Sequence, residues 1–442
     1  EGGDLILPKA KRSFTASFRL FFKSLGPGLV TGASDDDPSG IATYSQAGSQ
    51  FGFGMLWLAL FQFPLMTVVQ EMCARIGLVT GSGLASVIKK RYSRKVVFPT
   101  ASLLLIANTI NIGADIGSMA ASIRLVFPQL PRIVATLSFT VFILFVEIIV
   151  PYKSYVKILK YLRLSLFAYI VTSIIVGGHW NQLVIASIVP HVEITPAFAM
   201  MLVAIFGTTI SPYLFFWQAS EEVEDIANHK KGDIGKGKQP HIAKKEISLM
   251  RKDTAIGMAF SQIIMWAIIT TTAGTLHIHG ITDIQSADQA ARALEPLVKT
   301  SPNAGEISKI IFALGIIGTG LLAIPVLAGS SGYALSYAFG WNQGVSKKFK
   351  QANGFYMIVA SSTIIGLWIN FTDIDPIKAL VYTAVINGVV AVPILFTIMK
   401  IANDKKILGY NTNKLWPNVI GWLTFVIMGI SVIIMFPTWG KR

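Results

Sequence analysis

The chain has 442 residues, of which 52% are hydrophobic and 14% are charged, and its mean hydropathy is +0.58. A soluble protein of this length carries about a quarter charged residues, so the composition excludes a soluble globular class. The net charge is +15, but the basic residues decorate alternate loops rather than one surface, which argues against a nucleic-acid partner. The single cysteine, Cys73, excludes a disulfide within the chain.

Apolar segments long enough to cross about 30 Å of hydrocarbon recur along the whole chain. They predict an all-α polytopic membrane protein that is embedded in the lipid bilayer and preceded by a basic cytoplasmic tail over residues 1–23. The eleventh and last predicted helix is 415–438. The eleven predicted transmembrane helices are 24–49, 52–78, 96–121, 131–150, 156–178, 197–222, 253–279, 305–339, 353–371, 377–402 and 415–438.

The basic residues also predict the orientation of the chain. With the N-terminus in the cytoplasm, 29 Lys and Arg residues fall in cytoplasmic segments and 7 in external ones. Cytoplasmic loops of membrane proteins carry such an excess of Lys and Arg. We therefore expect a multi-pass protein of the cell membrane with its N-terminus in the cytoplasm and, after eleven spans, its C-terminus outside.

The first span contains a segment that a continuous lipid-facing helix could not hold. Residues 25–40 include several glycines and the run Asp35-Asp36-Asp37-Pro38. Unpaired charge and unpaired backbone groups are both costly in hydrocarbon. The segment therefore predicts a helix that breaks in mid-membrane and points its ends at a cation.

The sixth span contains a second interruption, with Gly207, Thr208, Ser211 and Pro212 near its middle. Five spans separate the starts of the two interrupted helices, so the two helices cross the membrane in opposite directions. This pattern predicts an inverted repeat of residues 24–178 and 197–402, followed by the appended helix. Interrupted helices at corresponding places in two halves indicate the central site of a transporter.

These motifs resemble the NRAMP family of divalent-metal transporters, and the resemblance covers nearly the whole chain. It is carried by Gly26-Pro27-Gly28, by Asp37-Pro38-Ser39-Gly40, by the end of the second span at 70–81, and by Leu327-Ala328-Gly329. The resemblance implies the LeuT-type fold, a 5+5 inverted repeat with discontinuous helices 1 and 6 plus one extra helix. It also implies alternating access around a cation site in mid-membrane.

The resemblance places the metal ligands of the family on particular residues of this chain. The family's Asp is kept as Asp37, whereas its Asn falls on Gly40 and its Met falls on Ser211. The two backbone carbonyls that complete the site fall on Ser34 and Thr208.

Groups that serve proton movement in the family are replaced here. Two histidines of the sixth span become Tyr213 and Gln218, and two acids of the third span fall on Asn111 and Ala114, with Asp115 displaced by one position. Histidine is the side chain that titrates near neutral pH, so we expect weak or absent proton coupling.

The two lost metal ligands favour a hard cation. A thioether selects soft or borderline metals, and Ser211 replaces it with a hydroxyl, while Gly40 is expected to free space. Mg²⁺ dehydrates reluctantly, so a wide, all-oxygen pocket suits partly hydrated Mg²⁺, with Mn²⁺ as a further substrate. A branch of NRAMP-related proteins is taken to carry Mg²⁺, and this sequence resembles it. The alternatives are a carrier of a monovalent or organic cation that has lost the metal site, and a non-transporting sensor on the same fold.

Three of four further polar residues keep two interpretations each. Asp36 either flanks the ion or holds its water shell, whereas Asp35 is expected to cap or hydrogen-bond the exposed amides at the start of the second half-helix. Asn387 either faces the ion or bridges helices. Asp115 is either an acid of the ion pathway or a partner in an interhelical hydrogen bond.

The sequence carries no nucleotide-binding loop, nucleophile–base pair or metal-hydrolase spacing. No enzymatic activity and no cofactor are therefore expected. The expected partners are the transported divalent cation and the bilayer, without nucleic acid and without an obligate protein partner.

Overall fold

Every regular element in the described part of the chain is a helix, as the composition predicts. The structure is a computed structural model that describes residues 27–150, 163–178, 180–229, 242, 244–372 and 374–436. Its α-helices are α2 Pro27–Asp35, α3 Pro38–Phe51, α4 Trp57–Thr80, α5 Leu84–Arg91, α6 Arg94–Val126, α7 Arg132–Ile149, α9 Phe167–Val176, α10 Trp180–Ile188, α11 Pro196–Thr209, α12 Pro212–His229, α13 Lys244–Thr275, α14 Ala287–Arg292, α15 Ala304–Phe339, α16 Asn353–Leu367, α17 Pro376–Ala402, α18 Lys405–Leu408 and α19 Leu415–Met435. Short 3-10 turns cover Gly52–Met55, Arg163–Leu166, His277–His279, Glu295–Val298, Phe349–Gln351, Trp368–Phe371 and Gly409–Asn411.

Each predicted span has a helical counterpart. Within the described residues, nine segments are long and apolar enough to cross a membrane, with α11 and the first part of α12 counted together. The first predicted span corresponds to the pair α2 and α3, and the fifth corresponds to α9 with the 3-10 turn before it. The predicted tail 1–23 and the start of the fifth span at 156–162 lie outside the described residues.

Several boundaries differ from the prediction, and the largest difference among the described residues lies at the start of α13. Helix α13 begins at Lys244, nine residues before the predicted span 253–279, because a helix can continue past the hydrocarbon edge with polar side chains in water. Helix α10 lies between the predicted spans 156–178 and 197–222, where the sequence predicts no helix. The chain bends by 118° between α9 and α10, next to Gly177 and Gly178.

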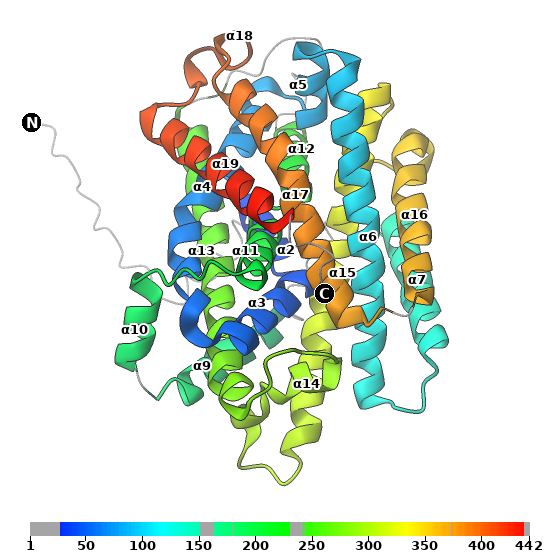
Figure 1. Cartoon of the computed structure of the whole chain (residues 1–442). Coiled ribbons are helices and arrows are strands. Elements are labelled where there is room, and N and C mark those ends of the chain that lie inside the picture. Colours follow the sequence, from blue (N-terminus) through cyan, green and yellow to red (C-terminus); the bar gives the residue numbers. More distant parts are fainter. Residues whose placement is uncertain are drawn as a thin grey trace, which may run out of the picture.

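The two ends of the helix bundle differ in charge. Figure 1 shows α5 and α18 at one end and α14 at the opposite end. The last turn of α5 contains Lys89, Lys90 and Arg91, and α18 contains Lys405 and Lys406. Both basic helices therefore gather at the end that the sequence assigns to the cytoplasm, and α14 lies at the end assigned to the outside.

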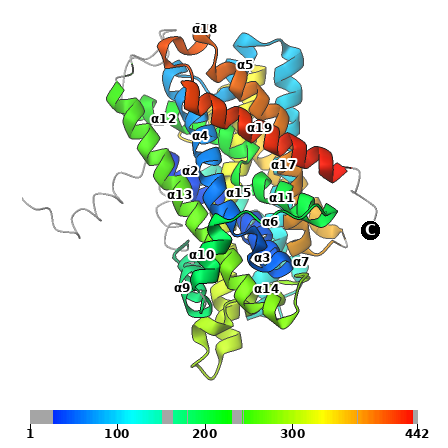
Figure 2. The ribbon, with the colours of Figure 1, turned by 60° about the vertical axis from the view of Figure 1, so that its left-hand side comes forward.

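Glycines let the broken helices approach their neighbours closely. A Cβ built at Gly32 of α2 would lie 2.3 Å from backbone atoms of Gly257 in α13. A Cβ at Gly207 of α11 would lie 1.9 Å from the carbonyl oxygen of Ala384 in α17. Small residues at such crossings allow tight packing where no hydrophobic force distinguishes helix from lipid. Helix α13 runs beside both α2 and α3 (Figure 2).

An ion pair links α4 to its surroundings. The i, i+4 spacing of Glu71 and Arg75 predicts a salt bridge, which the structure confirms at 3.1 Å. Arg251 of α13 binds the same Glu71 oxygen at 2.8 Å, and Arg75 also donates to the side chain of Asn413 at 2.5 Å. The local pair is thus part of a network between helices, which spacing along one helix could not predict.

Candidate functional site

The first helix break is built by Asp37 and Pro38. Asp37 has extended backbone angles (φ −72°, ψ 173°), and its Oδ1 accepts hydrogen bonds from the Gly40 backbone N–H and the Ser39 hydroxyl, both at 2.7 Å. The carboxylate therefore caps α3, and Pro38 suits the first helical position because its missing N–H would have no partner there. The prediction that Asp35 provides this cap is wrong, because Asp37 occupies the capping position.

The second oxygen of Asp37 belongs to a chain of polar side chains that joins three helices. Asn111 of α6 donates through Nδ2 to Asp37 Oδ2 and to Asp115 Oδ2, both at 3.2 Å. Asn387 of α17 donates through its own Nδ2 to Asn111 Oδ1 at 3.3 Å. All four side chains are buried.

These hydrogen bonds bear on the alternative interpretations of Asn387 and Asp115. Asn387 does bridge helices, as one of its two interpretations expects, whereas an ion contact of Asn387 stays a prediction. The hydrogen bond of Asp115 lies within α6 rather than between helices. The sequence marks Asn111 only as the position of a lost acid, although its i, i+4 spacing to Asp115 indicates that the two side chains can meet.

Asp35 and Asp36 face a different helix. The Ser261 hydroxyl of α13 donates to Asp35 Oδ2 and, at 3.1 Å, to Asp36 Oδ1. The three consecutive aspartates are thus divided between α13 on one side and α6 on the other. Within the described residues, no group of three or more His, Cys, Asp or Glu side chains could hold a metal ion. An ion at the break would therefore need a mixed set of carboxylate, amide, carbonyl, hydroxyl and water oxygens.

The second helix break is uncharged. Helix α11 ends at Thr209, α12 starts at Pro212, and Ser211 lies between them. The Ser211 hydroxyl donates to the carbonyl oxygens of Gly207 and Thr208, both at 2.5 Å. These are carbonyls that the end of α11 would otherwise leave without an intrahelical partner.

Two tyrosines connect the breaks to each other. Tyr213 of α12 donates from its hydroxyl to the Ser34 carbonyl of α2 at 3.1 Å. In a second contact between the breaks, the Thr208 hydroxyl of α11 donates to the Tyr44 oxygen of α3 at 3.1 Å. The two carbonyls that the resemblance assigns to the site, those of Ser34 and Thr208, therefore each accept one hydrogen bond. A carbonyl oxygen has two lone pairs, so each retains one for a cation or its water.

The open space expected beside Gly40 is not there. A Cβ at Gly40 would lie 3.3 Å from the Asp35 carbonyl oxygen, 3.4 Å from the Tyr44 ring and 3.5 Å from Asp37 Oδ1. The fully buried Tyr44 ring occupies the space that the missing Asn side chain was expected to leave. Sequence comparison at one position could not show that a residue one turn further along α3 packs back onto it.

The site is closed to solvent in this conformation. The exposed fraction of each residue is at most 2% for its polar residues Ser34, Asp36, Asp37, Thr208, Ser211 and Asn387, and Gly40 is buried as well. A cavity of about 220 Å³ lies further along α3, α11 and α17 and is lined in part by Gln46, Met201 and Asp283. Along α11, Gly207 and its close crossing with α17 lie between the cavity-lining Met201 and the second break.

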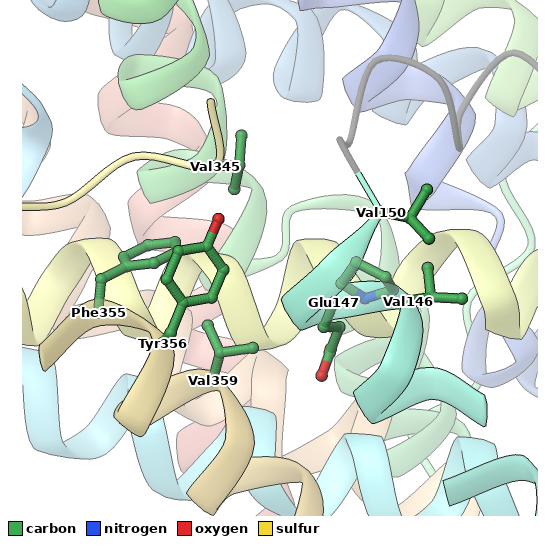
Figure 3. A pocket seen from close by; sticks show the side chains of 9 residues that line it. Val146, Glu147, Val150, Val345, Phe355, Tyr356 and Val359 are labelled. Carbon is green, nitrogen blue, oxygen red and sulfur yellow. The ribbon is translucent and has the colours of Figure 1, made fainter. Parts of the chain in front are cut away.

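A smaller cavity lies away from both breaks. Figure 3 shows Val146, Glu147 and Val150 of α7 and its C-terminal end facing Phe355, Tyr356 and Val359 of α16, around a space of about 30 Å³. Glu147 accepts a hydrogen bond from Thr363 at 3.2 Å. None of the residues that line this cavity belongs to either break. Glu147 is therefore an intramembrane carboxyl outside the candidate ion site.

Comparisons with known proteins match this architecture. The family described as natural resistance-associated macrophage protein-like (Nramp) matches residues 28–438. The divalent metal cation transporter MntH of Klebsiella pneumoniae (strain 342) is 26% identical over 428 residues, which cover 94% of each chain. The MntH of Pectobacterium carotovorum subsp. carotovorum is 23% identical over 415 residues, which cover 91% of each chain.

Solved structures share the fold. The manganese transporter of Eremococcus coleocola, in complex with an aromatic bis-isothiourea substituted compound, has a TM-score of 0.71 at 17% identity, covering 94% of this chain and 87% of that chain. Mhp1, a nucleobase-cation-symport-1 family transporter in a closed conformation with bromovinylhydantoin bound, has a TM-score of 0.56 at 10% identity, covering 95% and 94%. The chain therefore has the LeuT-type arrangement with discontinuous helices 1 and 6.

Proposed function

The chain belongs to the NRAMP family, and from this membership we propose that it is a divalent-cation transporter whose main substrate is partly hydrated Mg²⁺, with Mn²⁺ as a further substrate. The relatives named above are transporters rather than enzymes, and the two breaks of this chain offer binding groups rather than a reacting pair. The observation that carries the choice of ion is Ser211, which supplies oxygen where the family has sulfur.

Hard oxygen ligands favour Mg²⁺ over softer metals. The oxygen ligands in this proposal are the Asp37 carboxylate, the Ser34 and Thr208 carbonyls, the Ser211 hydroxyl and the Asn387 amide, all of which belong to buried residues. Thioethers draw soft and borderline metals, whereas carboxylate, carbonyl and water oxygens suit Mg²⁺. Without a sulfur ligand, the site lacks the group that would favour Mn²⁺ over Mg²⁺.

The hydrogen bonds of Asp37 support a partly hydrated ion. Its two oxygens accept three hydrogen bonds, from Ser39, Gly40 and Asn111. An ionised carboxylate offers about four lone-pair positions, so roughly one remains for a metal or a metal-bound water. Mg²⁺ requires octahedral coordination and retains waters readily, so water fills the positions that the protein leaves open.

Uptake is proposed to follow the membrane potential with little or no proton coupling. Neither break presents a histidine, because Tyr213 and Gln218 stand at the family's histidine positions in α12. The potential is worth about 2.3 kcal/mol per charge per 100 mV, which is sufficient to concentrate a doubly charged ion.

The distribution of charge supports the proposed orientation. The basic helices α5 and α18 lie at one end of the bundle and α14 lies at the other (Figure 1). We assign the first end to the cytoplasm, which places the N-terminus inside and the C-terminus outside the cell membrane.

The test is uptake into liposomes that contain the purified protein and a pH-sensitive dye. Mg²⁺, Mn²⁺ and Ca²⁺ are compared at equal concentration and at a fixed inside-negative potential. We expect Mg²⁺ uptake without a change of internal pH. Entry of Mn²⁺ without Mg²⁺ would contradict the choice of ion, and uptake of monovalent or organic cations alone would favour the alternative substrate.

A further inference from the structure

Asp115 is an acid in the middle of α6 that the ion site described so far does not use. Its side chain is fully buried, and no Lys, Arg or His of the described residues forms an ion pair with it. Its Oδ2 accepts a hydrogen bond from Asn111, whereas its Oδ1 has no hydrogen-bond partner. A buried polar atom without a partner is rare in folded proteins and calls for an explanation.

A second buried oxygen without a partner belongs to the same group of side chains. Asn387 donates to Asn111 through Nδ2, and its Oδ1 has no hydrogen-bond partner. Asn111 contacts Asp37, Asp115 and Asn387, so both open oxygens belong to side chains one hydrogen bond away from it. Asp115 and Asn387 can thus both supply acceptors beside the carboxylate at the first break.

One amide nitrogen sets the spacing of the two carboxylates. Asn111 Nδ2 donates to Asp37 and to Asp115, so the accepting oxygens lie within roughly 6 Å of each other. Two oxygens that bind Mg²⁺ directly from opposite sides stand only about 4.2 Å apart, at about 2.1 Å from the ion each. A limit of this size leaves room for one direct contact and one contact through a metal-bound water.

The charges lead to the same arrangement. An ionised carboxylate inside a membrane is costly unless it is paired, and a divalent cation needs two negative charges for neutrality. Asp37 supplies one of them. Asp35 and Asp36 share Ser261 on α13, on the other side of the break, whereas Asp115 shares the hydrogen-bond donor of Asp37.

We infer that Asp115 is the second carboxylate of the ion site and holds the water shell of the bound divalent cation, with Asn111 as the residue that positions both carboxylates. This inference rests on the proposed function. It assigns the substrate class to a hydrated divalent cation, because a monovalent ion would leave one of the two carboxylates unbalanced.

The test compares Asp115→Asn with Glu147→Gln in the full chain. Both replace an intramembrane carboxyl with its amide, but Glu147 lies outside the site and bonds to Thr363. The readouts are the rise in melting temperature caused by Mg²⁺, which reports binding alone, and Mg²⁺ uptake into liposomes. We expect wild type and Glu147→Gln to respond alike, and Asp115→Asn to need at least 100-fold more Mg²⁺ for the same rise. Asp115→Glu, which keeps the charge, should recover binding to within about tenfold of wild type.

The outcomes separate this inference from the proposed function. If Asp115→Asn responds to Mg²⁺ at wild-type concentrations, the second-carboxylate assignment is overturned while the proposed function stands. If wild type shows neither a thermal response nor uptake with any divalent ion, the proposed function itself fails. Should Asp115→Asn not fold, Asn111→Leu keeps both carboxylates but removes their shared donor. A drop of about tenfold in Mg²⁺ affinity then supports the assignment, and an unchanged affinity overturns it.

Discussion

The break between α2 and α3 and the break between α11 and α12 share one backbone plan but differ in chemistry. Each places a capping-type residue before a proline that starts the second half-helix, Asp37-Pro38 in one and Ser211-Pro212 in the other. The Asp37 side chain turns forward and accepts hydrogen bonds from the start of α3, whereas the Ser211 hydroxyl turns back and donates to the end of α11. The first break therefore supplies negative charge, and the second supplies neutral oxygens.

This difference assigns separate tasks to the two breaks. The Coulomb energy of a divalent ion depends mainly on nearby formal charge, so binding strength should depend on the first break. The choice among divalent ions depends on ligand softness and geometry, so selectivity should depend on the second. Substitutions at the two breaks should then have different consequences, which the following predictions test in order of expected size.

The largest effect is expected for Asp37→Asn. Asn is as good a helix cap as Asp, so α3 should keep its start while the site loses a charge. We predict a loss of at least 100-fold in Mg²⁺ uptake, and the same loss for Mn²⁺, with little change in melting temperature without metal. Uptake within tenfold of wild type would show that the first break does not supply the charge.

A change of selectivity is expected for Ser211→Met. The thioether should raise the ratio of Mn²⁺ to Mg²⁺ uptake by about tenfold, since sulfur favours the softer ion. Ser211→Leu is the matched control, because Leu has a similar size and also removes the hydroxyl that donates to Gly207 and Thr208. Equal ratios in the Met and Leu variants would exclude a role of the ligand atom.

A smaller effect is expected for Tyr213→Phe, which removes the hydrogen bond between the breaks. The Ser34 carbonyl loses its donor, and a net hydrogen bond is worth about 1 kcal/mol. We predict a lower melting temperature without metal and a change of only a few-fold in uptake. A loss of uptake as large as that of Asp37→Asn would place the tyrosine hydroxyl among the essential ligands.

The smallest effect is expected at Asp288, which lies in α14 outside both breaks. The hydrogen bond from Lys309 at 2.9 Å, together with Arg292 at 3.1 Å, holds the pKa of this carboxyl below its usual 3.8. A depressed pKa adds stability above the pKa of the unfolded chain, and this contribution is lost as the pH falls through the pKa of the folded state.

Asp288→Asn should therefore destabilise the protein by only about 0.5 kcal/mol at pH 7, the usual size for an exposed ion pair. The difference in melting temperature from wild type should shrink as the pH falls below about 4, where the carboxyl of the unfolded chain is protonated. Mg²⁺ uptake should not change. A difference in uptake, or a difference in stability that persists at low pH, would contradict this account of Asp288.

The fold was predictable because its signals are local. Apolar runs mark the spans, and the run Asp35-Asp36-Asp37-Pro38 cannot continue a membrane helix. The bridging role of Asn111 and the sharing of Ser261 were not predictable, because both depend on how α6 and α13 pack against the first break. The position of Tyr44 beside Gly40 has the same origin, since the sequence does not show which side chain fills a gap.

The most direct test of the division between the breaks measures Mg²⁺ and Mn²⁺ uptake by Asp37→Asn and Ser211→Met side by side, at one fixed membrane potential. The account predicts that Asp37→Asn loses uptake of both ions, whereas Ser211→Met still transports and changes only their ratio. If Asp37→Asn changes only the ratio, or Ser211→Met abolishes uptake of both ions, the assignment of charge to the first break and selectivity to the second is contradicted.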